Sequence, residues 1–226
     1  MEAIVLAGGL GTRLRACVPD RPKPMADIKG RPFLEYLLEG WIEKGVSHFI
    51  LSIGYQGDFI ENHFGNCWKG VAISYSKEET LLGTGGGLKK AACKLKSQDP
   101  FLLLNGDTYF FPTISKLKGK MTMALRTVEN GERYGTVLLD RAGKISSFIE
   151  KNPGKGLING GVYLIHPSLL KKIPSKVPLS LEKDLLPNWI GELYGMESTA
   201  NFIDIGVPSD YLVFNNQVEI WQKQKS

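Results

Sequence analysis

Two basic side chains, Arg13 and Lys23, follow closely behind a glycine-rich stretch, Gly8-Gly9-Leu10-Gly11-Thr12. Glycine permits tight turns and leaves backbone N–H groups free to point at an anion. A guanidinium can donate to two phosphate oxygens at once, and an ammonium between Pro22 and Pro24 is held on a stiff stretch of chain. The segment therefore predicts a phosphate site that combines backbone donors with cations.

The glycine stretch matches neither of two common nucleotide-binding motifs. A Walker loop requires Gly-Lys followed by Ser or Thr, but Arg13 and Leu14 occupy that place. A dinucleotide fingerprint ends its Gly-x-Gly-x-x-Gly in glycine, where this chain has Leu14. These differences disfavour a dinucleotide oxidoreductase and favour a site that grips a triphosphate.

Two acidic residues, Asp107 and Asp204, lie beside apolar segments. Asp107 follows the apolar run Phe101–Leu104, and Asp204 lies inside Phe202-Ile203-Asp204-Ile205-Gly206. A carboxylate in apolar surroundings needs a partner or an ion, and Mg²⁺ prefers such hard oxygen ligands together with substrate phosphates. The pair therefore predicts a magnesium site.

The first half of the chain must position these groups, and its pattern is that of an α/β fold. Short apolar segments predict buried strands at Ala3–Leu6, Phe49–Ile53, Phe101–Leu104 and Val71–Tyr75. Helical spacing predicts helices within 32–45 and over Gly87–Leu95. This alternation predicts a Rossmann-like, mainly parallel sheet with right-handed crossovers, in which ligands lie at the carboxyl ends of the strands.

From about Met121 the pattern changes to strands joined by short turns. These predict an antiparallel, β-rich lobe, followed by short helices and a terminal amphipathic helix. The expected strands are Met121–Thr127, Tyr134–Leu139, Ile145–Glu150 and Leu157–Ile165, and the expected helices are Pro167–Ile173, Leu181–Trp189 and Pro208–Gln224. We expect a single domain over 1–226, with halves at about 1–120 and 121–226.

Composition narrows the class of protein. The net charge is +5, but the basic residues are dispersed among acids, which favours an enzyme of phosphorylated small molecules over a nucleic-acid binder. The sequence has no apolar run long enough to span a membrane and does not begin like a signal peptide, so we expect a cytoplasmic protein without a membrane partner. The three cysteines have no metal-like spacing.

The stretch Gly8–Leu14, followed by Pro22-Lys23-Pro24, resembles the opening signature of the sugar-1-phosphate nucleotidyltransferases, or NDP-sugar pyrophosphorylases. Residues 16–21 replace the Pro-x-Thr stretch that usually precedes Pro-Lys, so this arm departs from the family pattern. The resemblance covers most of the chain. It implies transfer of a nucleotidyl group to a sugar 1-phosphate with release of pyrophosphate.

The same resemblance implies roles for individual residues. Arg13 would hold the leaving pyrophosphate, Lys23 would stabilise charge at the attacked phosphate, and Asp107 and Asp204 would bind Mg²⁺. The first half would bind the nucleotide and the second the sugar. The nucleotide contacts in the first loop would be Leu6, Ala7, Gly8, Gly9, Gly11 and Thr12.

A second glycine turn, Leu81–Gly87, corresponds to the turn that lines the base pocket in this family, through Gly83 and Thr84. Glu78 and Glu79 precede it. A carboxylate accepts hydrogen bonds from guanine N1–H and N2–H₂, so an acid here predicts GTP as the substrate. Glu79 is the expected reader because it is closer to the turn, and Glu78 remains the alternative.

The β-rich half would bind the sugar and its phosphate. The resemblance assigns these contacts to Gly135, Glu150, Lys151 and Asn159. The implied sugar is a heptose 1-phosphate, with mannose 1-phosphate as an alternative. The role of Glu182, Lys183 and Asp184 stays open, and so does the choice between a monomer and a homodimer. A non-catalytic sugar-nucleotide sensor is the rival class, but it would not need Arg13, Lys23 and both acids.

Overall fold

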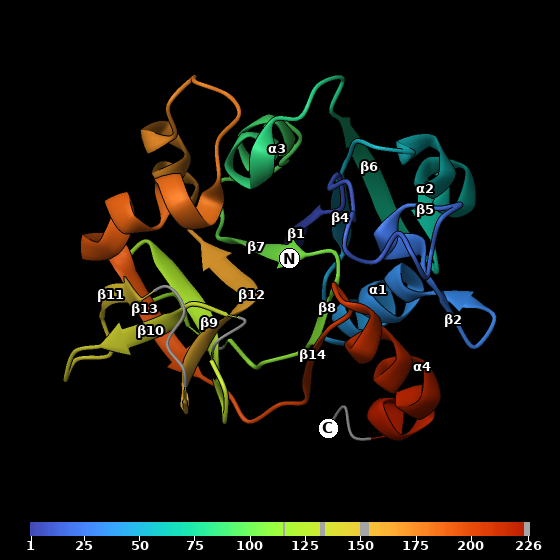
Figure 1. The fold of residues 1–226 in the computed structure, drawn as a ribbon. Helices are drawn as coiled ribbons and strands as arrows, with labels where there is room; N and C mark the ends of the chain where they lie inside the picture. Colours follow the sequence, from blue (N-terminus) through green and yellow to red (C-terminus); the bar gives the residue numbers. More distant parts are fainter. Residues whose placement is uncertain (115, 132–133, 150–153, 224–226) are drawn as a thin grey trace.

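A computed structural model describes residues 1–114, 116–131, 134–149 and 154–223. Its central feature is a parallel sheet built from the first half of the chain. The strands are β1 (Glu2–Leu6), β4 (His48–Ile53), β6 (Val71–Lys77) and β7 (Phe101–Asn105). They lie in the order β7-β1-β4-β6, and β5 (Cys67–Trp68) pairs antiparallel to β6 at the edge (Figure 1).

The order of these strands fixes where a ligand can bind. The chain moves outward from β1 through β4 to β6, and then returns to place β7 on the opposite side of β1. Such a reversal makes a topological switch point, where loops leaving neighbouring strands diverge and form a crevice. The glycine stretch after β1 and the Asn105-Gly106-Asp107 turn after β7 meet at this point.

Helices cover both faces of the sheet, as the buried strands require. One face packs against α1 (Phe33–Glu43), α2 (Gly57–Phe64) and α4 (Pro208–Lys223), and the other against α3 (Gly83–Ala92) (Figure 1). Short helical turns at Pro167–Lys172, Leu181–Leu185 and Pro187–Glu192 lie on the same side as α3. Successive residues of β1 alternate between the two cores: Val5 faces the first and Ile4 the second.

The second half extends the same sheet. Its strands are β9 (Met121–Val128), β10 (Thr136–Leu139), β11 (Ile145–Ile149), β12 (Gly156–Ile165) and β13 (Leu193–Glu197). β12 pairs antiparallel to β7 and so joins the halves, while β13 pairs parallel to β9. Two small ribbons complete the fold, β8 (Thr108–Phe110) with β14 (Phe202–Asp204), and β2 (Asp27–Ile28) with β3 (Arg31–Pro32).

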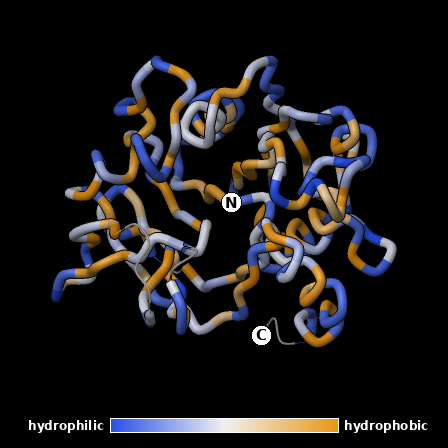
Figure 2. Tube along the Cα trace, in the orientation of Figure 1, coloured by the Kyte–Doolittle hydropathy of each residue, from blue (hydrophilic) through white to orange (hydrophobic). Residues whose placement is uncertain are grey.

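The predicted fold class, a mixed but mainly parallel sheet with helices on both faces, is confirmed. Hydrophobic segments coincide with the strands and hydrophilic ones with the outer loops (Figure 2). None of the helices in the described ranges is long and apolar enough to cross a membrane.

The boundaries differ from the prediction where tertiary contacts override local pattern. Helix α3 begins at Gly83 rather than Gly87, because Gly85 N–H donates to the Leu179 carbonyl at 2.7 Å and anchors a glycine-rich first turn. The expected helix over Leu181–Trp189 divides into two short turns. Helix α2 and strand β13 were not predicted, since one is only eight residues long and the other contains Gly195.

Candidate functional site

A cleft of about 270 Å³ lies at the carboxyl ends of β1 and β7. It gathers predicted residues from both glycine turns and from the turn after β7. Those that line it are Leu6, Ala7, Gly8, Gly9, Lys23, Gly83, Thr84 and Asp107. Segments far apart in sequence therefore meet at the switch point, as a nucleotide site requires.

The first glycine turn supports Lys23 as well as the cleft wall. Gly11 has φ +61°, and a Cβ added there would lie 2.9 Å from the Lys23 Cβ. A side chain at this position would both strain the backbone and displace the lysine. Gly11 and Thr12 themselves do not line the cleft.

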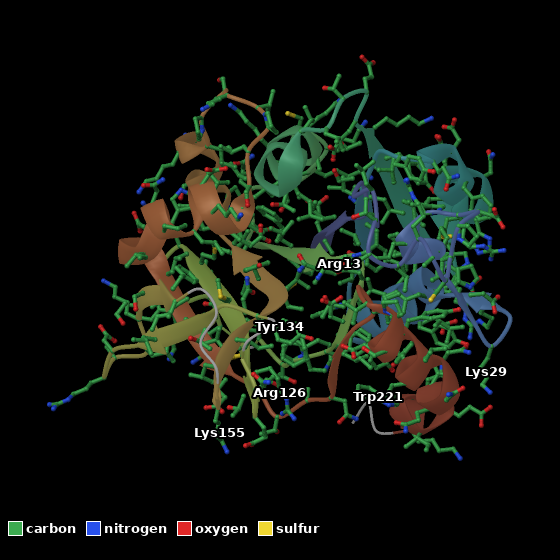
Figure 3. The ribbon with its side chains drawn as sticks, in the orientation of Figure 1. Arg13, Lys29, Arg126, Tyr134, Lys155 and Trp221 are labelled. Carbon is green, nitrogen blue, oxygen red and sulfur yellow. The ribbon has the colours of Figure 1, made fainter. Side chains whose placement is uncertain are left out.

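Arg13 is exposed and also lies outside the cleft lining, although its positive charge acts on Asp204. Arg13 comes from the first half and Tyr134 from the β-rich half, and both lie near the middle of Figure 3. The contact of Arg13 with a ligand stays a prediction.

Lys23 Nζ forms an ion pair with Asp107 Oδ2. Lys23 begins a short helical turn, Lys23–Met25, directly after Pro22. Asp107 is held by its turn, in which Gly106 N–H donates to the Leu6 carbonyl at 3.0 Å. The two charged side chains are largely buried, so the pair is shielded from solvent. A charged ligand that enters the cleft would therefore interact strongly with both side chains.

Asp204 lies next to Asp107 across the β8–β14 ribbon. Ile205 N–H donates to the Asp107 carbonyl at 3.0 Å, and Gly206 N–H donates to Asp204 Oδ1 at 2.7 Å. Burial, together with the negative charge of Asp107, raises the pKa of Asp204 to about 6. Lys23 and Arg13 oppose this rise in pKa without cancelling it.

The two carboxylates fit a magnesium ion that shares its coordination with substrate phosphates. A buried acid whose pKa is raised by a neighbouring acid is one that a cation would stabilise in its charged form. The described part of the chain has no cluster of three or more metal-ligating side chains. Mg²⁺ needs only one or two carboxylates when phosphates and water complete the shell, so the pair is sufficient.

Of the two acids before the second glycine turn, Glu78 lines the cleft and Glu79 does not. Glu78 Oε1 accepts from Ser52 Oγ at 2.9 Å, and Oε2 accepts from Leu82 N–H at 3.2 Å. Its carboxylate lies against Gly8 and Gly87, where an added Cβ would come within 3.0 and 2.8 Å of Oε1. Glu79 is exposed. The structure therefore places Glu78, the alternative, in the cleft and the expected Glu79 outside its lining, because proximity in sequence did not indicate which side chain turns inward.

The second glycine turn is fixed by the C-terminal half. Gly83 has φ +74°, and a Cβ there would lie 2.5 Å from the Leu179 carbonyl oxygen. Leu179 N–H in turn donates to the Leu82 carbonyl at 2.8 Å. A larger residue at position 83 would push these two segments apart.

A second cleft, of about 180 Å³, adjoins the first and contains Asp204. It is lined by the predicted Gly135 and Asn159, together with Tyr134 and Thr108. Asn159 Oδ1 accepts from Gly161 N–H at 3.0 Å, and its Nδ2 donates to the Tyr163 hydroxyl at 2.6 Å. The predicted Glu150 and Lys151 lie outside the described residues.

Asn105 and Glu182 line both clefts, and the sequence did not assign either to the site. A signal was present in each case: Asn105 directly precedes Gly106-Asp107, and Glu182 lies in the Leu181–Asp184 motif whose role stayed open. Their position joins the two clefts into one site with Asp107 and Asp204 near the junction.

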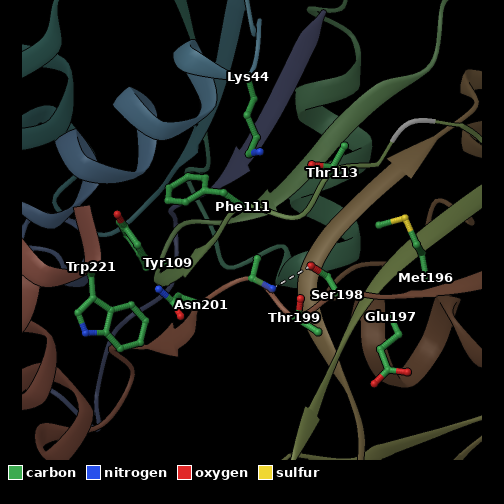
Figure 4. A pocket seen from close by; sticks show the side chains of 11 residues that line it. Lys44, Tyr109, Phe111, Thr113, Met196, Glu197, Ser198, Thr199, Asn201 and Trp221 are labelled. Carbon is green, nitrogen blue, oxygen red and sulfur yellow. Dashed lines mark hydrogen bonds between the residues drawn. The ribbon is translucent and has the colours of Figure 1, made fainter. Parts of the chain in front are cut away.

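A larger hollow, of about 560 Å³, lies elsewhere and contains none of the predicted residues. Figure 4 shows Tyr109, Phe111 and Trp221 around it, with Lys44 on its rim. Its lining has neither a glycine turn nor a pair of acids. The two smaller clefts are therefore the candidate functional site.

Comparisons with known proteins identify the family of the chain. The model of the nucleotidyl transferase family matches residues 2–220. The chain is 41% identical to a D-glycero-α-D-manno-heptose 1-phosphate guanylyltransferase from Aneurinibacillus thermoaerophilus, over 93% of this chain and 95% of the relative. It is 40% identical to the protein of that name from Campylobacter jejuni, over 95% and 98%. A crystal structure of HddC from Yersinia pseudotuberculosis complexed with GMP-PN is 33% identical, with a TM-score of 0.86 over 96% of this chain and 99% of the other.

Proposed function

The chain belongs to the nucleotidyl transferase family, and from this premise we propose that it transfers a guanylyl group from GTP to a sugar 1-phosphate. The products would be a GDP-sugar and pyrophosphate. The observation that carries the proposal is the junction of two clefts at the acids Asp107 and Asp204, with Lys23 beside them. One cleft suits a nucleotide and the other a sugar, so a phosphate from each substrate would meet there.

The reaction requires positioning and charge stabilisation rather than a covalent enzyme intermediate. An oxygen of the sugar phosphate attacks the α-phosphorus of GTP in line, and the bond to the β-phosphate oxygen breaks. Lys23 stabilises the charge that develops on the attacked phosphate, and Arg13 meets the departing pyrophosphate. To bind the phosphate, the Lys23 ammonium must leave the Asp107 carboxylate and donate to a phosphate oxygen instead.

Asp107 and Asp204 would hold Mg²⁺. When bound, the ion would neutralise phosphate oxygens and withdraw electron density from the reacting phosphorus. The apposition of the two carboxylates and the raised pKa of Asp204 support this assignment.

Guanine recognition falls to Glu78. Its oxygens already accept from Ser52 and Leu82, which fix the orientation of the carboxylate. Each carboxylate oxygen can accept a second hydrogen bond, so N1–H and N2–H₂ of guanine can be met together. Adenine has no 2-amino group and an unprotonated N1, and would leave the carboxylate without these donors.

For the sugar we propose D-glycero-α-D-manno-heptose 1-phosphate, since the two similar guanylyltransferases are named for it. Gly135 and Asn159 would contact its hydroxyls in the second cleft. Glu150 and Lys151 stay predictions for the sugar and its phosphate. Mannose 1-phosphate shares the manno ring and is the alternative acceptor.

A substrate matrix tests the proposal. The protein with Mg²⁺ is mixed with each of GTP, ATP, UTP and CTP and with heptose, mannose and glucose 1-phosphates, and both pyrophosphate and NDP-sugar are measured. We expect the highest turnover with GTP and the heptose 1-phosphate. GDP-mannose as the preferred product would overturn the choice of sugar. Binding of GTP without product from any sugar phosphate would favour the non-catalytic sensor.

A further inference from the structure

Glu182 borders both clefts, so a ligand that bridges them must pass it. The residue comes from the turn Leu181–Leu185, in which Leu186 N–H donates to the Leu181 carbonyl at 2.8 Å, an i→i+5 bond. Wide turns of this kind occur frequently at functional sites. The turn packs on α3, next to the second glycine turn. Glu182 therefore lies on the wall where the two substrates would meet.

One carboxylate oxygen of Glu182 is already occupied, and this fixes the direction of the other. Oε2 accepts from Thr84 Oγ1 at 2.9 Å and from Ser180 Oγ at 3.1 Å. Thr84 Oγ1 also accepts from Leu181 N–H at 2.7 Å, so its hydroxyl is committed to this contact. Across the described ranges, no donor hydrogen-bonds to Oε1. A charged acceptor in a cleft is thus held ready for a ligand donor.

The surroundings of Glu182 on the sugar side are hydroxyl-binding groups. Asn159 lines the second cleft and donates to the hydroxyl of the buried Tyr163 at 2.6 Å. Burial raises the pKa of Tyr163, and the negative charge of Glu182 adds to the rise. Tyr163 is fully buried and lines neither cleft, so its hydroxyl orients Asn159, while Asn159 and Glu182 themselves line the second cleft.

We propose that Glu182 Oε1 accepts a hydrogen bond from a hydroxyl of the sugar 1-phosphate, which makes Glu182 a specificity-determining residue for the sugar. The inference rests on the proposed guanylyl transfer. The ribose of GTP also carries hydroxyl donors, but Gly135 and Asn159, which line the second cleft with Glu182, favour the sugar. A carboxylate built to accept from a hydroxyl discriminates strongly against an analogue without it, because its lone pair is then left unpaired.

The experiment compares the wild-type protein, Glu182→Ala and Glu182→Gln in steady-state assays. The substrates are GTP with D-glycero-α-D-manno-heptose 1-phosphate, its 2-, 3-, 4- and 6-deoxy analogues, and, in a separate arm, 2′-deoxy-GTP and 3′-deoxy-GTP. Lys183→Ala is the matched control, because Lys183 is the adjacent exposed residue on the same turn. Circular dichroism and thermal melting check that each variant folds.

For Glu182→Ala we expect kcat/KM for the intact sugar phosphate to fall by about 10- to 150-fold, the range for a hydrogen bond to a charged group. KM for GTP should change by less than about twofold. For one deoxy analogue, kcat/KM of the wild type should fall by a similar factor relative to the intact sugar phosphate. For Glu182→Ala, kcat/KM should be the same with that analogue as with the intact sugar phosphate. Glu182→Gln should show the same pattern with a smaller loss, and Lys183→Ala should match the wild type.

Other outcomes would overturn the inference. Equal penalties for every deoxy sugar in wild type and Glu182→Ala would show that no sugar hydroxyl depends on Glu182. Loss of discrimination against a deoxy-GTP instead would assign the contact to the ribose. A raised KM for GTP with an unchanged sugar profile would indicate that Glu182 acts only by holding Thr84. No product from the wild type with any substrate would be a failure of the proposed function itself.

Discussion

Lys23 and Asp107, which are 84 positions apart in the chain, form an ion pair in the nucleotide cleft. Each therefore neutralises the other before substrate arrives. When GTP binds with its metal ion, the Lys23 ammonium can pair with phosphate oxygens instead, and the Asp107 carboxylate can pair with a divalent cation. The roles of the two residues are coupled, and substitutions at both should not have additive effects.

Removal of either cation should reduce turnover. We expect Lys23→Ala and Arg13→Ala each to lower kcat by about 10²–10³, the scale of losing one preorganised charge-stabilising donor. Arg15→Ala is the matched control, because Arg15 lies on the same arm and its guanidinium lies over the Tyr55 ring, 5.0 Å from the ring centroid. Steady-state kinetics at saturating Mg²⁺ measure the effect. If only KM rose, the residue would bind ground and transition states equally and its assigned role would be wrong.

The acids should be needed for turnover but not for folding. Asp107→Asn and Asp204→Asn should each lower kcat by about a hundredfold or more, since a metal ion's charge stabilisation contributes several kcal/mol. Asp58→Asn, at an exposed position on α2, serves as the control. Activity is measured over a range of Mg²⁺ concentrations. Near-normal turnover of both variants at saturating Mg²⁺ would contradict the metal site.

The ionised carboxylate of Asp204 should lower the free energy of unfolding at neutral pH. Its pKa is raised from 3.8 to about 6 by burial and by Asp107. Between those values the folded chain keeps a proton that the unfolded chain has lost, so this residue's contribution to stability falls as pH rises and is lost above about pH 6. Without Mg²⁺, Asp204→Asn should therefore have a higher free energy of unfolding at neutral pH, by up to about 3 kcal/mol.

Denaturant unfolding of wild type and Asp204→Asn at several pH values checks this expectation. The difference in the free energy of unfolding should grow from near zero at about pH 4 to its full value above about pH 6. If the difference in the free energy of unfolding does not vary with pH, the pKa of Asp204 is not raised in the folded chain.

Base preference should depend on Glu78. In Glu78→Gln an acceptor oxygen becomes a donor that opposes guanine, so the preference for GTP over ATP should fall by about 10- to 150-fold. Glu79→Gln is the matched control and should keep the wild-type preference. Competition assays with the four nucleotides give the ratios. A general rise in KM for every nucleotide, with the preference intact, would mean that Glu78 only supports Ser52 and Leu82.

Much of the fold and the phosphate-binding elements could be predicted because their signals are local. Apolar runs mark the strands β1, β4 and β7, and an acid directly after a buried parallel strand must face the crevice. The position of Asp107 in the cleft follows from these two facts, and that of Lys23 was predicted from the glycine stretch after β1. Their direct ion pair could not be predicted, since it depends on side-chain geometry across 84 positions.

The remaining features depend on contacts that no local pattern encodes. Adjacent residues Glu78 and Glu79 have the same chemistry, and only the hydrogen bonds to Ser52 and Leu82 show which one turns inward. The early start of α3 depends on the Leu179 carbonyl, almost a hundred residues later. Glu182 enters the site from the same distant segment, so its position follows from the packing of that segment on α3.

In the proposed reaction, the bond broken in GTP lies between the α- and β-phosphates, and the guanylyl group goes to a sugar phosphate. Parallel reactions with α-³²P-labelled and γ-³²P-labelled GTP and the heptose 1-phosphate follow both phosphates. We expect the α-label to appear in a GDP-sugar and the γ-label in pyrophosphate, both only when the sugar phosphate is present. Release of the γ-label as inorganic phosphate, or an α-label that never leaves GTP in a folded, GTP-binding protein, would contradict the proposed reaction.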